Sequence, residues 1–367
     1  MKGLYVHIPF CEYICHYCDF VKSVPKNQSV IDQYLMRLRA EILSYESHFD
    51  SIETIFIGGG TPSMLNVDQL TYLFDSLTRI KPVEYSIELN PESYTHEKGL
   101  LFKKYGINRI SMGVQSFDDD ILKYLNRGHK ADDVFWIIND LKSLGVTYIS
   151  IDLIFAIPGQ TINHIQYDLE QFMKLDITHV SYYSLILEDK TYFYHQYLKG
   201  NFKPMDEDNE AIMYEYVMQY LNAHGFEQYE ISNYAKHNHY SLHNNIYWTL
   251  GEYIGVGLGA HGFIDNFRTY NERGMRQYMD HFLKEKTLQT DDLKLQDELI
   301  FGLRLTKGVN IPRLEKKYNI KLFEKYPQIH DKMKLGLIEV KDEYIRLTKE
   351  GTMLGNQVFM VFVWHTY

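Results

Sequence analysis

Three cysteines, Cys11, Cys15 and Cys18, lie in one short segment near the N-terminus of this chain, and its 367 residues contain no others. Disulfides cannot organise a chain of this length from one such segment, because bridges within it would close only very short loops. Closely spaced thiolates are typical ligands of iron or zinc. The sequence therefore predicts a metal site and not a disulfide framework.

The number of cysteines restricts the kind of metal site. Iron–sulfur clusters are usually held by four Cys ligands. With three, a 4Fe-4S cluster leaves one iron open, or takes its fourth ligand from a His or a small molecule. Two alternatives are a structural zinc ion completed by His7 or His16, and a set of inert thiols. Because zinc sites more often pair two Cys-x-x-Cys units, the cluster is the preferred hypothesis.

Segments rich in β-branched residues alternate with amphipathic segments through the first half of the chain. The alternation predicts strands at residues 4–8, 54–57, 85–89, 109–113, 148–155 and 179–185, and helices at residues 30–45, 67–79, 95–105, 131–144 and 162–175. Repeated strand–helix units of this kind build parallel sheets with helices outside. About six units are fewer than the eight of a closed barrel. The predicted fold class is therefore α/β, with a partial (β/α)6 barrel.

Three domains are expected along the chain. Residues 1–187 should form the partial barrel, and residues 188–290 a mixed α/β extension. Within the extension, the glycine-rich segment at residues 255–259 is interpreted as a close-packed turn, since it has no acidic partner at the spacing of a dinucleotide site. Residues 291–367 should form a small helical, winged-helix-like module, with a strand at residues 344–347.

Composition and charge exclude several classes of function. The formal charge of −10 argues against nucleic acid as a partner, because such proteins carry basic surfaces. No apolar segment approaches the ~20 residues of a membrane-spanning helix, and no secretory signal precedes the first predicted strand. We expect a cytoplasmic protein, peripheral to a membrane at most. The sequence leaves a monomer and a homodimer both open.

Polar residues and glycines follow the predicted strands, where reactive groups of barrel folds gather. Gly58, Gly59, Gly60 and Thr61 come directly after the second strand, so backbone N–H groups there can approach a polar ligand closely. Four more polar residues lie at or near the ends of later elements: Glu88, Gln115, Arg127 and Asp152. A carboxylate and a carboxamide suit hydroxyl and amine groups, and a guanidinium suits a carboxylate. A triple glycine by itself is more often an ordinary turn, and salt bridging is the ordinary role of such polar groups.

The segment from Tyr5 to Cys18 resembles the Cys-x-x-x-Cys-x-x-Cys signature of radical S-adenosylmethionine (SAM) proteins. It is most similar to the branch that contains the oxygen-independent coproporphyrinogen III oxidases and the HemW-type heme chaperones. The resemblance implies that SAM chelates the open iron and that an electron from the cluster cleaves it to a 5'-deoxyadenosyl radical. It also implies SAM contacts at the matching motif positions: Tyr5, Tyr17, Gly58, Gly59, Gly60, Thr61, Glu88, Gln115, Arg127 and Asp152.

Two departures count against the oxidase. The oxidase type has a fourth cysteine two positions after the triad, where this chain has Phe20, and it has a longer segment before the first cysteine. By resemblance, coproporphyrinogen dehydrogenase activity is therefore not expected here. A barrel held by a metal without radical chemistry would also fit the fold, but it would leave the polar strand ends unexplained.

The hexapeptide from His243 to Trp248 matches the HNxxYW motif of the heme-binding chaperones. An imidazole beside aromatic rings suits heme, because His ligates iron while rings pack on the macrocycle. The resemblance implies heme bound by His243, Tyr247 and Trp248, with His243 on the iron. Nearby competitors are His237, His239 and His261. The implied partners are heme, acceptor hemoproteins such as respiratory cytochromes, and an electron donor for the cluster.

Overall fold

The computed structural model describes residues 1–363, so residues 364–367 of the predicted C-terminal module lie outside it. Six parallel strands form the centre of the fold, and each pairs with the next in sequence order. Their apolar side chains are almost fully buried, as a parallel sheet covered by helices requires. The strands are β1 (Lys2–Ile8), β2 (Thr54–Gly59), β3 (Glu84–Leu89), β4 (Arg109–Gln115), β5 (Tyr148–Phe155) and β6 (His179–Ser184).

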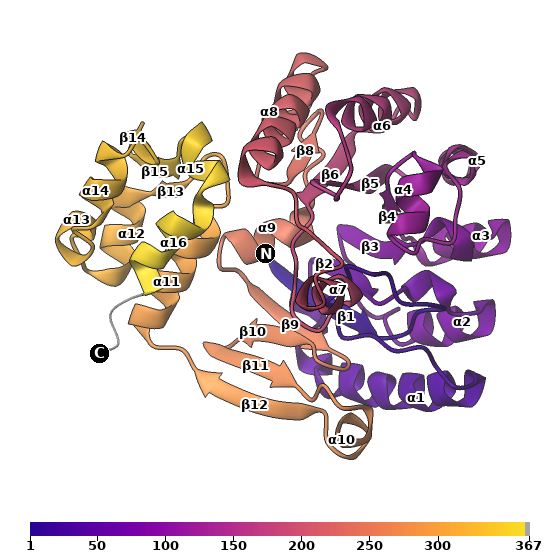
Figure 1. Cartoon of the computed structure of the whole chain (residues 1–367). Coiled ribbons are helices and arrows are strands. Elements are labelled where there is room, and N and C mark those ends of the chain that lie inside the picture. Colours follow the sequence, from indigo (N-terminus) through magenta and orange to yellow (C-terminus); the bar gives the residue numbers. More distant parts are fainter. Residues whose placement is uncertain (364–367) are drawn as a thin grey trace.

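Helices cover the outer face of these strands (Figure 1). Capping residues in the local sequence stabilise the N-termini of these helices. In one capping box, the Asn66 side chain accepts a hydrogen bond from the backbone N–H of Gln69, and the Gln69 side chain accepts one from the backbone N–H of Asn66. The covering helices are α1 (Gln28–Ser44), α2 (Val67–Asp75), α3 (His96–Tyr105), α4 (Asp119–Tyr124), α5 (Ala131–Ser143), α6 (Ile162–Lys174) and α8 (Glu207–Ala223). Short 3-10 helices are η1 (Glu46–Ser51), η2 (Pro62–Met64) and η3 (Pro91–Ser93).

The segment at residues 188–290 adds strands to both edges of the barrel sheet. On one edge β9 (Glu252–Val256) pairs in parallel with β1, and β10 (His261–Ile264), β11 (Phe267–Asn271) and β12 (Leu283–Leu288) follow antiparallel. On the other edge, β8 (Asn233–Ala235) and β7 (Glu227–Gln228) extend from β6. The segment's helices are α7 (Tyr192–Leu198), α9 (Leu242–Trp248) and α10 (Met275–Asp280). One sheet of 12 strands results, and the domain boundary near residue 187 stays a prediction.

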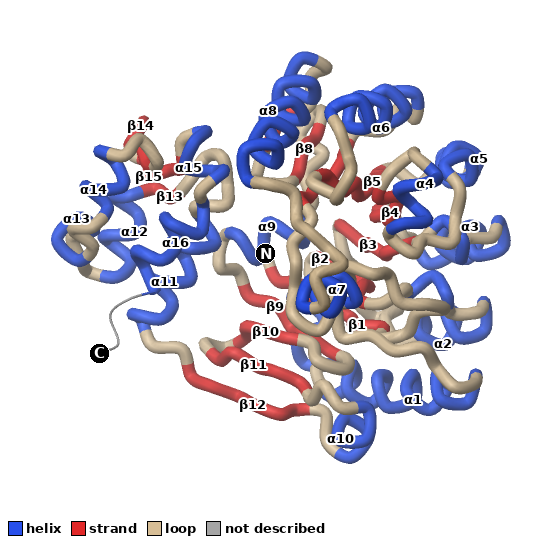
Figure 2. Tube along the Cα trace, viewed as in Figure 1, coloured by secondary structure: helices blue, strands red, loops and turns tan. Residues whose placement is uncertain are grey.

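A small module follows with a hydrophobic core of its own. Its helices are α11 (Asp291–Gly302), α12 (Ile311–Tyr318), α13 (Leu322–Lys325), α14 (Ile329–Lys334), α15 (Lys349–Met353) and α16 (Gly355–Val363). They pack around the antiparallel strands β13 (Val309–Asn310), β15 (Tyr344–Leu347) and β14 (Ile338–Lys341) (Figure 2). The arrangement fits the predicted winged-helix-like module, and the predicted α/β class is confirmed.

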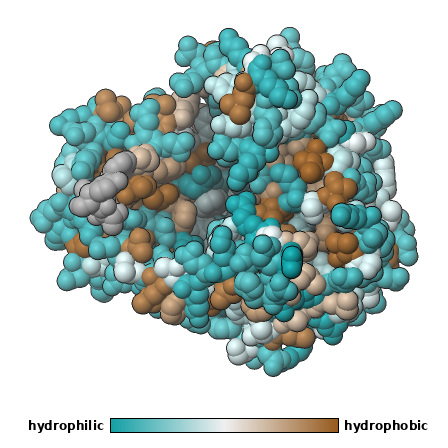
Figure 3. Space-filling view, turned by 60° about the horizontal axis from the view of Figure 1, so that its bottom comes forward, coloured by the Kyte–Doolittle hydropathy of each residue, from teal (hydrophilic) through white to brown (hydrophobic). Residues whose placement is uncertain are grey.

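The surface agrees with the composition. Hydrophilic residues cover most of the face shown in Figure 3, with hydrophobic side chains scattered among them. None of the helices within residues 1–363 has the length and apolar character that a bilayer crossing requires.

Candidate functional site

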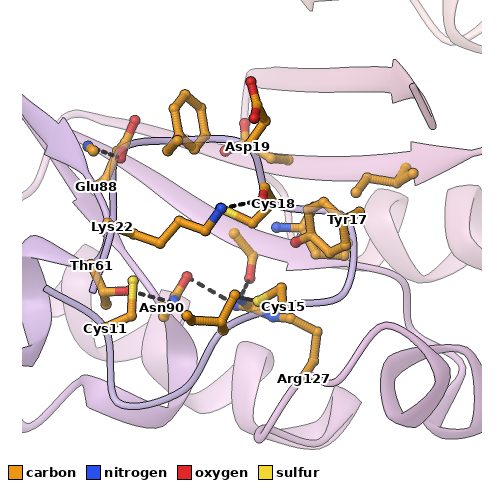
Figure 4. Close-up of a pocket in the computed structure, with 18 of the residues that line it drawn as sticks. Cys11, Cys15, Tyr17, Cys18, Asp19, Lys22, Thr61, Glu88, Asn90 and Arg127 are labelled. Atoms are coloured by element: carbon orange, nitrogen blue, oxygen red, sulfur yellow. Dashed lines mark hydrogen bonds between the residues drawn. The ribbon is translucent and has the colours of Figure 1, made fainter. Parts of the chain in front are cut away.

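A cavity of about 540 Å³ opens where the barrel strands end (Figure 4). Its size falls in the ~300–1,000 Å³ range of small-molecule sites. It brings together most residues that the sequence predicted for the cluster and SAM: Cys11, Cys15, Tyr17, Cys18, Gly59, Gly60, Thr61, Glu88, Gln115, Arg127 and Asp152. Gly58 is not part of the lining, and Tyr5 lines a different cavity. The strand ends therefore converge as the barrel geometry predicts.

The cysteine loop lies over this cavity, with all three thiols on its lining. The Thr61 hydroxyl donates to Cys11 Sγ at 3.6 Å, and Arg127 Nη1 donates to Cys15 Sγ at 3.5 Å. Helix α7 packs on the outside of the loop, where the His16 ring stacks on Tyr192 with centroids 4.0 Å apart. The loop is thus held from both sides with its thiols turned inward.

Burial affects the protonation of these thiols. It raises the pKa of Cys11 to about 11 and also raises the pKa of Cys18. Metal ions reverse this preference, because a coordinating thiol loses its proton. Iron binding at this loop should therefore release protons.

The zinc alternative gains no support from its predicted fourth ligands. Both ring nitrogens of His7 are hydrogen-bonded, to the Tyr5 hydroxyl at 2.9 Å and to the Val21 carbonyl at 2.7 Å. His16 Nδ1 donates to the Tyr124 carbonyl. Across residues 1–363, no three His, Cys, Asp or Glu side chains are grouped closely enough to hold a single ion. Three thiols around a cavity with polar walls fit a cluster with an open iron, which is larger than one ion.

The glycine turn fits closely against the cysteine loop. Gly59 has φ +117°, and a Cβ there would lie 2.5 Å from the His7 ring. A Cβ on Gly60 would lie 2.7 Å from the Phe10 carbonyl oxygen and 3.0 Å from Cys11 Sγ. A side chain at position 59 would displace the His7 ring, and one at position 60 would displace Cys11, so the close approach of the two loops requires glycine at both positions.

Two partly buried carboxylates face the cavity from the strands. Glu88 accepts a hydrogen bond from the Gly59 N–H at 2.9 Å, and the Ser111 hydroxyl donates to Asp152 at 3.2 Å. Burial, with a smaller contribution from the charge of the neighbouring Asp152, raises the pKa of Glu88 to about 8. Burial also raises the pKa of Asp152 to about 6. A cationic or hydroxyl-bearing ligand would satisfy both groups, which the protein alone leaves poorly solvated.

Glu88 yields a prediction about pH. The pKa of Glu88 is about 8 in the folded protein, whereas the ordinary value for Glu is 4.5. Between these two pH values the folded state binds more protons than the unfolded state, so the free energy of unfolding falls as pH rises. Because water in the cavity screens part of the effect, Glu88→Gln should reduce this fall by about 1–3 kcal/mol. Urea unfolding of SAM-free protein across this pH range measures it, with the exposed Glu97→Gln as control. Identical pH slopes for Glu88→Gln and wild type would contradict the assignment.

Arg127 is fixed by a network that the sequence did not reveal. Its Nη2 donates to the Asn90 side-chain oxygen at 2.9 Å and to the Gly113 carbonyl at 2.6 Å. Asn90 in turn donates to Thr61 Oγ1 at 3.0 Å. Although burial alone would raise it, hydrogen bonding from His129 and the charge of Arg127 hold the pKa of Glu92 at about 2. The signal for Asn90 was its position directly after β3.

Gln115 occupies an unusual backbone conformation at the cavity. It has φ +71°, in the left-handed region, and it follows a register shift between β4 and β5. Non-glycine residues in this region cost free energy and cluster at functional sites. Its place on the cavity wall fits the ligand role predicted for it.

A second cavity of about 490 Å³ lies beside the first. Asp19 and Phe20, directly after the last cysteine, line both cavities, and Phe20 is 63% exposed. The other walls of the second cavity are mostly aromatic or basic: Tyr5, His7, Tyr247, Trp248, Tyr253, His261, Arg268, Arg273 and Phe301. The hexapeptide's Tyr247 and Trp248 therefore line this cavity, and their contact with heme stays a prediction.

His243 does not face either cavity. Its side chain lies beneath β2, where Nδ1 bonds the Thr54 hydroxyl at 2.7 Å and Nε2 bonds the Tyr247 hydroxyl at 2.8 Å. The residue is 1% exposed, and Glu84 accepts its backbone N–H. Thr54 begins β2, so His243 is at the opposite end of the barrel from the cluster loop. Burial lowers the pKa of His243 to about 3, which keeps its ring neutral.

Two family models match the chain. The model of the radical SAM superfamily matches residues 5–172, and the model of the HemN C-terminal domain matches residues 290–354. The chain is 41% identical to the heme chaperone HemW of Bacillus subtilis, with 99% of each chain covered. It is 36% identical to that of Lactococcus lactis, over 99% of this chain and 97% of the relative. It is 31% identical to that of Escherichia coli, over 98% of both.

Solved structures agree on the fold. Coproporphyrinogen III oxidase (HemN) from Escherichia coli superposes with a TM-score of 0.85 at 23% identity, covering 98% of this chain and 89% of that one. At this identity the likeness concerns the fold alone, and it confirms the predicted barrel. The full-length relatives decide the family: the chain belongs to the radical SAM superfamily and, within it, to the HemW family.

Proposed function

We propose that this protein is a heme chaperone that binds a 4Fe-4S cluster, SAM and heme, and delivers heme to acceptor hemoproteins. The observation that carries the proposal is the pair of cavities that share the wall formed by Asp19 and Phe20. One has the thiols and polar groups for a cluster and SAM. The other has aromatic and basic walls, as a flat, apolar ligand with carboxylates requires.

In the first cavity, Cys11, Cys15 and Cys18 would hold the cluster, which supplies an open iron and an electron when bound. The chain's own residues position SAM. Arg127, fixed by Asn90 and the Gly113 carbonyl, presents a cation to the methionyl carboxylate. The remaining polar groups of the site would bind the amine and the ribose: Gly59, Gly60 and Thr61 of the glycine turn, with Glu88, Gln115 and Asp152. Gly58, which is not part of the lining, would let the turn approach Glu88 closely. Tyr17 packs beside the ligand.

In the second cavity, Tyr5, Tyr247 and Trp248 would pack against the macrocycle. The hypothesis that His243 ligates the iron requires a rearrangement, because the Tyr247 hydroxyl occupies His243 Nε2. Tyr247 would have to release this hydrogen bond and move aside. Such a step would couple ligation to the shape of the cavity wall.

Heme for delivery would leave from the second cavity, which residues of the barrel sheet and Phe301 of the C-terminal module line together. We propose cytoplasmic action with respiratory cytochromes among the acceptors, reached peripherally where these are membrane-bound. A protein electron donor would reduce the cluster. The acidic surface does not favour nucleic acid as a partner, and either a monomer or a homodimer is compatible with the proposal.

A heme titration under anaerobic conditions tests the proposal. The reconstituted protein should bind about one heme per chain saturably by Soret absorbance, while the same reduced, SAM-supplied preparation should not decarboxylate coproporphyrinogen. Trp248→Ala should weaken heme binding roughly tenfold through lost packing, with unchanged cluster content. Trp136→Ala, at an exposed position on α5, is the matched control. Robust decarboxylation of coproporphyrinogen without saturable heme binding would contradict the proposal and support the oxidase function instead.

A further inference from the structure

We propose that His261 is the iron ligand of heme in the second cavity and that Arg273 anchors a propionate of the same molecule. The inference rests on the proposed function and specifies its site. It shifts the ligand role from the hexapeptide's histidine, which the fold buries, to a histidine on β10 that lines the cavity.

The availability of its ring distinguishes His261 from the other histidines near this site. His7 and His243 each have both ring nitrogens hydrogen-bonded. His261 is exposed, and within residues 1–363 no hydrogen bond occupies either of its ring nitrogens. Its ring stacks on Tyr270, with centroids 4.3 Å apart and planes 24° from parallel. The imidazole is therefore oriented by packing and has nitrogen lone pairs free for a metal.

Protonation favours ligation as well. Partial burial lowers the pKa of His261, and the charges of Arg273 and Arg268 lower it further. The neutral imidazole, which is the form that binds iron, thus predominates near neutral pH.

The glycine-rich turn brings His261 to the cavity. A Cβ on Gly255 would lie 1.8 Å from the His261 carbonyl oxygen, and one on Gly257 would lie 2.5 Å from the His7 carbonyl oxygen. Gly259 has φ +69°, and a Cβ there would lie 2.8 Å from Val21. These contacts confirm the close-packed turn that the sequence predicted. They also fix β10 against the segment that follows the cluster ligands.

The two arginines of the cavity differ in their pairing. Arg268 is engaged by Asp297 at 2.7 Å and by the Tyr253 hydroxyl at 3.1 Å. Arg273 is exposed, and no acidic side chain of residues 1–363 lies within ion-pair distance of it. An unpaired guanidinium at the rim of an aromatic cavity suits a carboxylate that stays near solvent, as heme propionates do.

A further polar group in the cavity wall lacks a partner. The indole N–H of Trp248 is shielded from solvent and has no acceptor among residues 1–363, while Arg304 lies over the ring at 4.6 Å. Buried donors without acceptors are uncommon in native structures and often indicate a missing ligand or water. His261, Arg273 and Trp248, the residue that carries this donor, all line one cavity.

The first test compares three single variants of the full-length reconstituted protein: His261→Ala, His243→Ala and His195→Ala. His195 is an exposed residue of α7 that lines neither cavity, so its variant is the matched control. Heme affinity should fall on the order of tenfold or more in His261→Ala, with a shifted Soret band, because the iron loses its axial ligand. Added imidazole should restore the band. Affinity for iron-free protoporphyrin IX should not change.

The outcomes separate the inference from the proposed function. If wild type binds heme and His261→Ala keeps the same heme affinity and Soret band, the assignment of His261 as iron ligand is wrong. A loss of heme affinity in His243→Ala would then identify His243 of the hexapeptide as the ligand. Equal losses of heme and protoporphyrin IX in His261→Ala would reduce His261 to a packing residue. Failure of wild type to bind heme would instead refute the chaperone proposal itself. Far-UV circular dichroism verifies that each variant is folded.

The second test concerns the propionate anchor. Arg273→Gln should weaken heme binding about three- to fivefold, as expected for a partly exposed ion pair. The variant and wild type should bind heme dimethyl ester equally, because the ester has no carboxylate. Arg276→Gln, an exposed neighbour outside the cavity, should behave as wild type. Equal affinities of Arg273→Gln and wild type for heme would overturn the anchor.

Discussion

Cys15→Ala should abolish the iron–sulfur cluster and leave the barrel folded. With three cysteines in the chain, the loss of one leaves two protein ligands. Cys15 itself is only partly buried and lies outside the hydrophobic cores, so the barrel does not depend on its side chain. The Cys15 Sγ also accepts from Arg127, but that guanidinium keeps its bonds to Asn90 and Gly113.

Iron and acid-labile sulfide after anaerobic reconstitution measure this effect. Wild type should contain about four of each per chain, and the variant close to none, with an unchanged far-UV spectrum. Ile14→Ala is the matched control, because Ile14 lies in the same loop and is 44% exposed. Stoichiometric zinc without sulfide in wild-type protein isolated without air would contradict the cluster.

Arg127→Ala should cost about 2 kcal/mol of SAM binding free energy, roughly a thirtyfold loss, because a charge-assisted pair to the carboxylate disappears from a desolvated site. The side chain is only 3% exposed and has a fixed geometry. Arg127→Lys should recover part of the affinity, since it keeps the charge and loses the planar fork.

Anaerobic equilibrium dialysis against SAM measures the affinity, and thermal unfolding reports on stability. Arg79→Ala is the control, because that side chain is 65% exposed and pairs with Glu46 far from the cavity. Full SAM affinity in both Arg127→Ala and Glu88→Ala would show that SAM binds elsewhere.

The strands and helices of the barrel could be predicted closely because the apolar pattern of each one depends on its own burial. Strand β5 has the predicted bounds of residues 148–155, and α5 and α6 differ from prediction by one residue at the C-terminus. Buried parallel strands are continuously apolar, and their helices have one apolar face. The barrel strands also predicted the first cavity, since polar residues at successive strand ends must converge.

The antiparallel part of the sheet was less predictable. Most side chains of β12 (Leu283–Leu288) are exposed, so the strand lacks the alternation that marks a half-buried one. Its partner β11 and the next strand β10 are short, and the set joins the barrel sheet through the pairing of β9 with β1, whose residues are far apart in sequence. The sequence therefore gave no sign that residues 188–290 would continue the barrel sheet at both edges.

The heme residues show a different limit. A hexapeptide identifies the residues of a site, but burial decides which of them a ligand can reach. His243 lies beneath β2 because Thr54 and Glu84 bind its ring and backbone, and these partners are far from it in sequence. Only the fold places Tyr247 and Trp248 on a cavity with His261 and leaves His243 outside it.

Heme transfer is the measurement that tests the chaperone function most directly. Heme-loaded, cluster-containing protein is mixed anaerobically with the heme-free form of a cytochrome, and the two proteins are separated and their heme spectra recorded. The proposal predicts that heme moves to the cytochrome, and faster than from heme-loaded serum albumin used as a passive donor. Heme that stays with this protein, or reaches the cytochrome no faster than from albumin, would contradict it.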